Sequence, residues 1–157
     1  MIGTAASTSN TAAKRQQQQN QPSKFADTYR RVLPTALLLS ISSDGVCKKL
    51  FHSLLFQMTR WFSGGASRVH EAESTALIEC IIDGLCDASN AKLRNVCAEL
   101  VAEYFQWTLK QATKADIAKH PETIDNLLSR VLVLASHAAE EKRLGAARAL
   151  SKIYRYL

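Results

Sequence analysis

Apolar residues recur along this chain with the period of an α-helix, and that spacing constrains the fold more than any other feature. It is clearest between residues 90 and 113, where a stripe keeps i, i+3, i+4, i+7 spacing over about four turns. The stripe consists of Leu93, Val96, Cys97, Leu100, Val101, Tyr104, Phe105 and Leu109. No segment alternates apolar and polar residues as a half-buried strand does. We therefore predict an all-α chain.

Five further segments show the same period, at roughly 25–42, 46–62, 71–86, from Pro121 onward, and 138–156. Pro34 lies inside the first of them and should kink or divide that helix, because proline lacks the backbone N–H. The residues expected to face inward are Phe25, Val32, Leu33, Leu37 and Ile41; Cys47, Leu50, Phe51, Leu54, Leu55 and Met58; Leu77, Cys80, Ile81 and Leu85; Ile124, Leu127, Leu128, Val131 and Leu132; and Ala146, Ala147, Leu150, Ile153 and Tyr154.

The six segments form three pairs, and the second member of each pair repeats a pattern. The aligned positions are Lys49, Arg94 and Arg143, then His52, Cys97 and Ala146, then Phe56, Val101 and Leu150. The spacing of the cations is close to the ~40–47 residues of HEAT repeats, which the pattern resembles. It implies a HEAT-like α-solenoid of three repeats at about 25–62, 71–113 and 121–157. In the HEAT signature an acid and a base on the inter-helix turn bridge to neighbouring repeats. The signature also expects a small residue at the position shared by His52, Cys97 and Ala146, and His52 is larger than that. Such a stack without polar caps leaves an apolar face at each end.

Residues 1–24 differ from the rest in composition. They are rich in Ser, Thr, Ala and Gln and have almost no large apolar residues, so we expect a disordered tail. The tail also holds 3 of the 20 basic residues and no acid, which leaves a net charge of only +3 on residues 25–157. An excess this small does not identify a nucleic-acid-binding domain.

The sequence contains no recognisable catalytic constellation. Phosphate-binding, zinc-protease and nucleophile-elbow motifs are missing, and the Ser63–Ala66 glycine segment joins two helices, as a plain loop does. The four cysteines fall in apolar helical stripes, which favours reduced thiols in a nuclear or cytosolic compartment over zinc ligands. We expect no enzyme activity, cofactor, metal or small-molecule ligand for this chain, and no membrane span. Cations on the inter-helix turns are the candidate partner or DNA ridge: Lys92, Arg94, Lys142 and Arg143.

Six strings occur in an order and spacing that resemble one protein family. They are residues 58–62 (MTRWF), 75–87 (TALIECIIDGLCD), 93–97 (LRNVC), 105–113 (FQWTLKQAT), 142–146 (KRLGA) and 153–155 (IYR). Together they resemble, over about 25–157, a stretch of the N-terminal HEAT-repeat region of a phosphatidylinositol-3-kinase-related kinase that acts at broken DNA ends. No match is recognised for residues 1–23.

The resemblance implies a piece of a very large nuclear serine/threonine kinase that works with the Ku heterodimer and DNA ends in non-homologous end joining. The family's kinase domain has no counterpart in these residues. Two alternatives stay open: an independent HEAT-type adaptor that binds proteins and is unrelated to DNA repair, and direct nucleic-acid binding by this segment.

Overall fold

The computed structural model describes residues 25–64, 71–111 and 122–156, and these residues form six α-helices and no strand. The helices are α2 (Ala26–Leu39), α3 (Gly45–Phe62), α4 (Glu71–Leu85), α5 (Ala91–Gln111), α7 (Glu122–Ala135) and α8 (Glu140–Ile153). The predictions of an all-α chain and of six helical segments are confirmed. The predicted disordered tail, at residues 1–24, lies outside the described residues.

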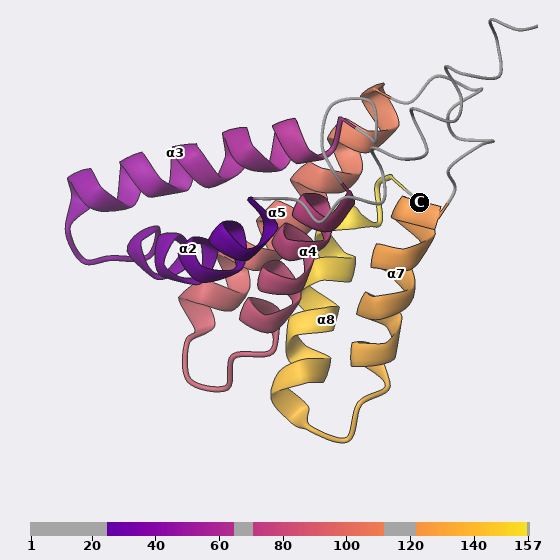
Figure 1. Cartoon of the computed structure of the whole chain (residues 1–157). Coiled ribbons are helices and arrows are strands. Elements are labelled where there is room, and N and C mark those ends of the chain that lie inside the picture. Colours follow the sequence, from indigo (N-terminus) through magenta and orange to yellow (C-terminus); the bar gives the residue numbers. More distant parts are fainter. Residues whose placement is uncertain (1–24, 65–70, 112–121, 157) are drawn as a thin grey trace, which may run out of the picture.

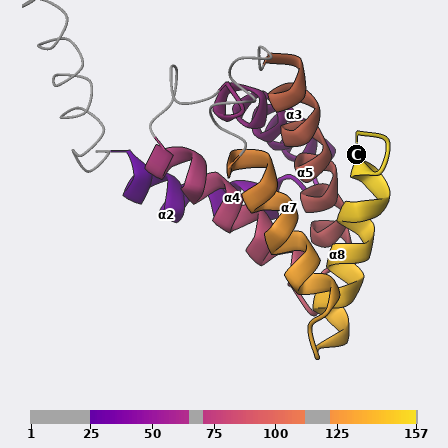
Figure 2. The same cartoon turned by 90° about the vertical axis from the view of Figure 1, so that its right-hand side faces the viewer.

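The helices stack as pairs in two layers (Figures 1 and 2). Each pair consists of two consecutive helices in contact: α2 with α3, α4 with α5, and α7 with α8. Along one layer α2 contacts α4 and α4 contacts α7, and along the other α3 contacts α5 and α5 contacts α8. This is the arrangement of a HEAT-like solenoid, in which each pair contacts its neighbours in the stack. The predicted repeat boundaries at residues 113, 121 and 157 lie outside the described ranges, and the division into repeats stays a prediction.

Helix α5 lies at the centre of the core because it contacts both neighbours in its layer and its own partner α4. Apart from Leu109, its stripe is buried as predicted: Leu100 and Val101 are 0% exposed, Phe105 is 1% and Tyr104 is 2%. Burial raises the pKa of the Tyr104 hydroxyl to about 12. At the α2–α3 pair, the ring of Phe62 meets Tyr29 edge-on at 5.2 Å. These contacts join all three pairs into one apolar cluster.

Helix α2 passes through Pro34 as a single helix, so the predicted division does not occur. Pro34 is exposed, and solvent can satisfy the carbonyl group that loses its N–H partner there. The helix ends at Leu39, and the Ser40 hydroxyl then donates to the Leu37 carbonyl at 2.6 Å.

Several residues predicted to face inward are exposed instead. The list comprises Phe25, Val32, Leu50, Leu54, Leu109, Leu132, Ala147 and Tyr154. All but Leu109 lie in the first and last pairs. The helical period identifies apolar faces correctly, but an outer pair has a second apolar face that no described helix covers. The inward assignment was therefore wrong at these positions, whereas all four residues named in α4 are buried.

The alignment of the first pair is also wrong by one residue. In the first turn of each second helix, an N–H donates to the carbonyl four residues earlier: Lys48 to Asp44, Arg94 to Asn90, and Arg143 to Ala139. Lys48, and not Lys49, is therefore equivalent to Arg94 and Arg143. The shift puts Phe51, rather than His52, at the position of Cys97 and Ala146, and puts the buried Leu55 at the position of Val101 and Leu150. The polar misfit at His52 disappears.

Candidate functional site

The turn between α4 and α5 is organised by two side chains. The Asp87 carboxylate accepts from the Asn90 N–H at 2.7 Å, the Ser89 N–H at 2.9 Å and the Ser89 hydroxyl at 3.0 Å. Arg94 donates from Nη1 to the carbonyl oxygens of Asp87 and Ala88, the latter at 3.2 Å, and is only 8% exposed. The N–H of Asn90, and then the Ser89 hydroxyl, hold the pKa of Asp87 below its usual value. Arg94 thus stabilises its own turn by hydrogen bonds.

The turn between α7 and α8 repeats this device. Arg143 donates from Nη1 to the carbonyl oxygens of His137 at 2.9 Å and Ala138 at 2.5 Å. His137 accepts at Nδ1 from the Ala139 N–H at 3.0 Å, which makes it a structural part of the turn. The Lys142 amine lies 3.4 Å from Nε2 of the same ring.

The four predicted ridge cations therefore divide into two kinds. Arg94 and Arg143 both bond to carbonyl groups of their own turns, whereas Lys92 is exposed and Lys142 is half-buried. The guanidinium groups of Arg94 and Arg143 therefore do not form the expected acid–base bridge to a neighbouring repeat. Lys92 and Lys142 are the two cations of this ridge that can reach a partner without first releasing a turn carbonyl.

In the layer of α3, α5 and α8, polar contacts between pairs run instead through side chains on the helices. Glu103 on α5 accepts from Arg60 of α3 at 2.5 Å and from the Trp107 indole N–H at 2.7 Å. Glu99 lies 3.7 Å from His52 of α3 and 3.6 Å from Lys152 of α8. These polar contacts cross the α3–α5 interface and the α5–α8 interface.

The aromatic residues next to cations take different roles. The guanidinium of Arg60 and the amine of Lys110 lie 5.4 Å and 5.2 Å from the Trp107 ring centre. Phe62 is buried, whereas Trp61 is 60% exposed. Of the two aromatic rings, only that of Trp61 is exposed to solvent.

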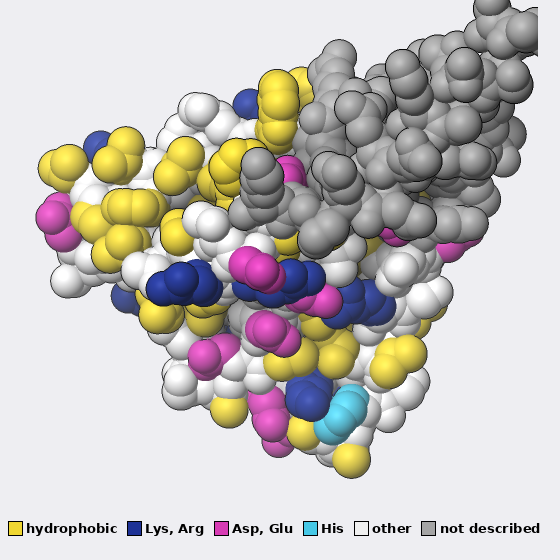
Figure 3. All heavy atoms as spheres, viewed as in Figure 1, with side chains coloured by type: hydrophobic (Ala, Val, Ile, Leu, Met, Phe, Trp, Pro, Cys, Tyr) yellow, Lys and Arg dark blue, Asp and Glu magenta, His cyan; other side chains and the backbone are white. Residues whose placement is uncertain are grey.

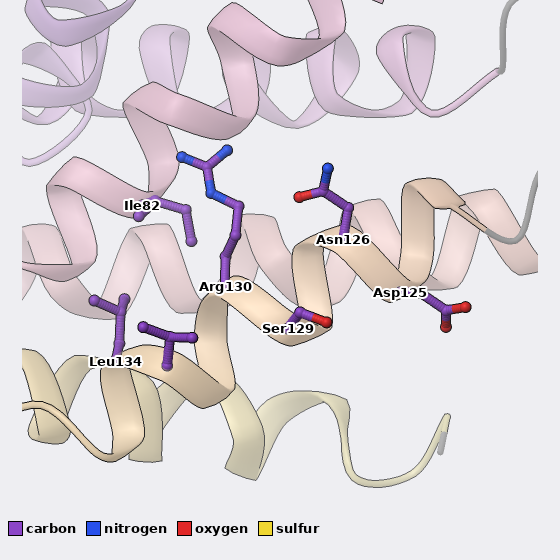
Figure 4. Close-up of a pocket in the computed structure, with 7 residues that line it drawn as sticks. Ile82, Asp125, Asn126, Ser129, Arg130 and Leu134 are labelled. Atoms are coloured by element: carbon purple, nitrogen blue, oxygen red, sulfur yellow. The ribbon is translucent and has the colours of Figure 1, made fainter.

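A cavity of about 650 Å³ lies between α4 and α7 (Figure 4). Its lining is Ile82, Asp125, Asn126, Ser129, Arg130, Val133 and Leu134. In Figure 4 the Arg130 side chain points toward α4, whereas Asp125 points away from it. The cavity therefore brings together no pair of groups able to exchange a proton, and none of its lining residues is a thiol or an imidazole.

The buried thiols of Cys80 and Cys97 are suited to packing rather than chemistry. Burial raises the pKa of Cys80 to about 12 and raises that of Cys97 still further. All four cysteines are free, and no cluster of three metal-ligating side chains occurs in the described ranges. Among the described helices, none is long and apolar enough to cross a membrane.

Comparison with known proteins shows which family this helical chain belongs to. Residues 23–157 match the family model described as DNA-dependent protein kinase catalytic subunit, CC1/2. The chain belongs to this family. It is 31% identical to the DNA-dependent protein kinase catalytic subunit of Gallus gallus over 144 residues, which are 92% of this chain and 4% of that protein. The corresponding proteins of Xenopus laevis and Dictyostelium discoideum are 34% identical over 81% of the chain and 31% identical over 89%.

The chain spans only about 3–4% of the length of these catalytic subunits. The resemblance seen in the sequence is thereby confirmed at the level of the family, and the chain matches a short helical part of proteins named as kinases. The match begins at residue 23, close to the boundary at residue 24 drawn from composition.

Sequence reasoning missed three features of the structure. These are the equivalence of Lys48 with Arg94, the close approach of α8 to α4 at the buried Gly145, and the exposed face of α3 that carries Leu50 and Leu54. The first had a readable signal. Asp44 and Asn90 each accept at Oδ1 from the N–H groups two and three residues on, as N-cap residues do. The other two depend on how neighbouring pairs meet, which spacing within one helix does not reveal.

Proposed function

We propose that this chain is a non-catalytic helical scaffold segment of a DNA-dependent protein kinase catalytic subunit-like protein that acts in double-strand-break repair by non-homologous end joining. The observation that carries the proposal is the family match over residues 23–157, which covers the whole described stack. The parent protein would be a nuclear serine/threonine kinase, and its partners would be the Ku heterodimer and DNA ends.

The segment's contribution is mechanical. Each pair is joined to the next by burial and by polar contacts such as Arg60 with Glu103 and Lys152 with Glu99. A stack joined in this way holds its exposed turns at fixed positions relative to one another. In this proposal the turn lysines Lys92 and Lys142 face partners, whereas Arg94 and Arg143 hold the turns in shape.

The test is immunoprecipitation from nuclear extract with an antibody raised against residues 71–111, before and after induced DNA breaks. We expect a polypeptide far longer than 157 residues that recovers both Ku subunits after breakage, with nuclease treatment as the control for bridging by DNA. A product of the size of this chain that recovers other proteins but no Ku would contradict the proposal and favour the independent adaptor.

A further inference from the structure

A groove separates α4 from α7, inside the stack and between its second and third pairs. It is the cavity of about 650 Å³ drawn in Figure 4, and it is called the α4–α7 groove below. Its apolar lining consists of Ile82 and Leu134, which are 7% and 9% exposed, and of Val133, which is 68% exposed. The groove therefore has buried apolar side chains at its base and an apolar side chain that solvent reaches.

The side chains of α7 account for the separation. In the same layer, Cys80 and Gly84 of α4 border Pro34 of α2 around a smaller cavity of about 270 Å³. On α7, Asn126 and Arg130 point toward α4 instead (Figure 4). The distance between packed helices depends on the side chains at the contact, so small residues let α4 approach α2 and long polar ones hold α7 away. The groove thus follows from the residues of α7.

Arg130 gives the groove a cation that has no counter-charge. At the α2–α4 interface, the guanidinium of Arg30 lies 3.4 Å from Glu79 and 3.1 Å from Asp27. Arg130 makes no comparable ion pair or hydrogen bond with the described residues, although it is half-buried and points toward α4. Asp125, in the same lining, points away from α4. An unpaired guanidinium in this position favours an incoming carboxylate, which it can hold by two parallel hydrogen bonds.

The backbone around the groove favours a helix as the bound segment. The lining residues of α7 lie inside a continuous helix, Glu122–Ala135, whose N–H and C=O groups are paired within it. An extended peptide in the groove would leave its own backbone groups on that side without protein partners, whereas a helix satisfies its backbone internally. The surrounding surface suits an amphipathic helix. In Figure 3, basic and acidic side chains alternate along a band across α2, α4 and α7, with hydrophobic side chains beside it.

We propose that the α4–α7 groove binds a short helix of a partner protein, one that carries an acidic residue with an aliphatic residue three or four positions away. The carboxylate pairs with Arg130, and the aliphatic side chain packs on Ile82 and Leu134. Asn126 and Ser129 line the same side of the groove and can hydrogen-bond polar side chains of the bound helix. The volume of the groove lies within the ~300–1,000 Å³ of sites that bury most of a ligand.

The experiment uses the full chain and a display library of helical peptides that is randomised at the i, i+3, i+4 and i+7 positions of one face. Peptides selected on the wild type are then titrated by fluorescence anisotropy against Arg130→Gln and Val133→Glu. The matched control is Arg31→Gln, because Arg31 is an exposed arginine on α2, outside the groove lining. Circular dichroism should show unchanged helix content in all three variants, since none of the replaced side chains is buried.

We expect the selected peptides to share Asp or Glu at one position and Leu or Ile three or four positions away. Arg130→Gln should weaken their binding by roughly tenfold to a hundredfold, as loss of a charged hydrogen bond does. Val133→Glu should also weaken it, because a second carboxylate then faces the acidic residue. Arg31→Gln should leave it unchanged. A repeated selection on Arg130→Glu should replace the acidic residue of the peptides by Lys or Arg.

A selection that yields no acidic consensus would overturn the proposal. Acidic peptides that bind Arg130→Gln as tightly as the wild type would do so too, because their binding site would lie elsewhere on the chain. Displacement of the peptides by an equal concentration of inorganic phosphate or of a single-stranded oligonucleotide would identify a general anion site instead of a helix-binding groove. The assay contains neither Ku nor DNA ends, so its outcome is independent of the proposed role in DNA repair.

Discussion

Replacing Gly145 with alanine isolates the closest approach between two pairs of the stack. Gly145 lies in α8 and is buried against the end of α4. A methyl group at this position would lie 2.9 Å from the carbonyl carbon of Leu85 and closer still to the oxygen. Both are backbone atoms, so no side-chain rotation can relieve the overlap. Helix α8 would have to move away from α4, and it would loosen the packing of the fully buried Ala146 and Ala149.

Two opposing terms set the magnitude. In a helix, alanine is favoured over glycine by about 1 kcal/mol. Forcing an extra methyl group into a packed interface costs about 1–3 kcal/mol, and the upper end applies here because the obstacle is backbone. We therefore expect Gly145→Ala to lower the free energy of unfolding by about 2 kcal/mol. For a chain of this length, that loss corresponds to a Tm lower by roughly 4–8 °C.

The assay is urea unfolding followed by circular dichroism, at a protein concentration at which the chain is monomeric. Gly45→Ala is the matched control, because Gly45 begins α3 and a methyl group there would meet no atom within 4 Å. The control should be neutral or slightly stabilising, by up to about 1 kcal/mol. The reasoning is refuted if Gly145→Ala raises the urea midpoint as much as Gly45→Ala does, since α8 and α4 would then have room to spare.

Three further outcomes follow from the turns and the core. Arg94→Ala should lower the free energy of unfolding by about 1.5–3 kcal/mol in the same assay, because it removes the hydrogen bonds of a buried guanidinium to the turn carbonyls. Lys92→Ala should change it by less than about 0.5 kcal/mol. The folded pKa of Asp87 is lowered, so its contribution is present above about pH 4 and lost below; urea midpoints of the wild type and Asp87→Asn should converge as pH falls. The folded pKa values of Cys80 and Cys97 are raised, so stability should hold up to about pH 8.5 and fall above it. Native Cys97 should also resist thiol reagents that modify it in urea.

The sequence was sufficient to predict the helices and their order, because the helical period depends only on which residues are apolar. It succeeded best in the middle pair, where α4 and α5 are surrounded by other helices and their stripes are buried. The same reasoning assigned Val32 and Leu50 to the interior, where they do not lie. An apolar residue on an outer pair has the same spacing along its helix whether or not another helix covers it. Periodicity therefore cannot tell a core face from a stacking face.

The one-residue error in the repeat alignment has a different origin. Aligning by cations matched Lys49 with Arg94, but the helix caps match Asp44 with Asn90. Asp87 lies in the turn, three residues before that cap. Capping is read from the residue whose side chain accepts the N–H groups two and three positions later. That criterion is local and would have placed Lys48 correctly.

The hydrogen bonds of the turns decide which variants can test the candidate ridge. Arg94 and Arg143 occupy the same helical position and bond to carbonyl groups of their own turns. Removing either loosens a turn, so weaker binding of Ku or DNA by such a variant would follow from a structural change even if no guanidinium touches a partner. Lys92 and Lys142 carry the same charge but do not bond to a turn carbonyl. Charge reversal at these two lysines, with unfolding free energy held constant, separates a partner contact from a turn defect. A loss of binding confined to the arginine variants would assign the repeated cation to the fold alone.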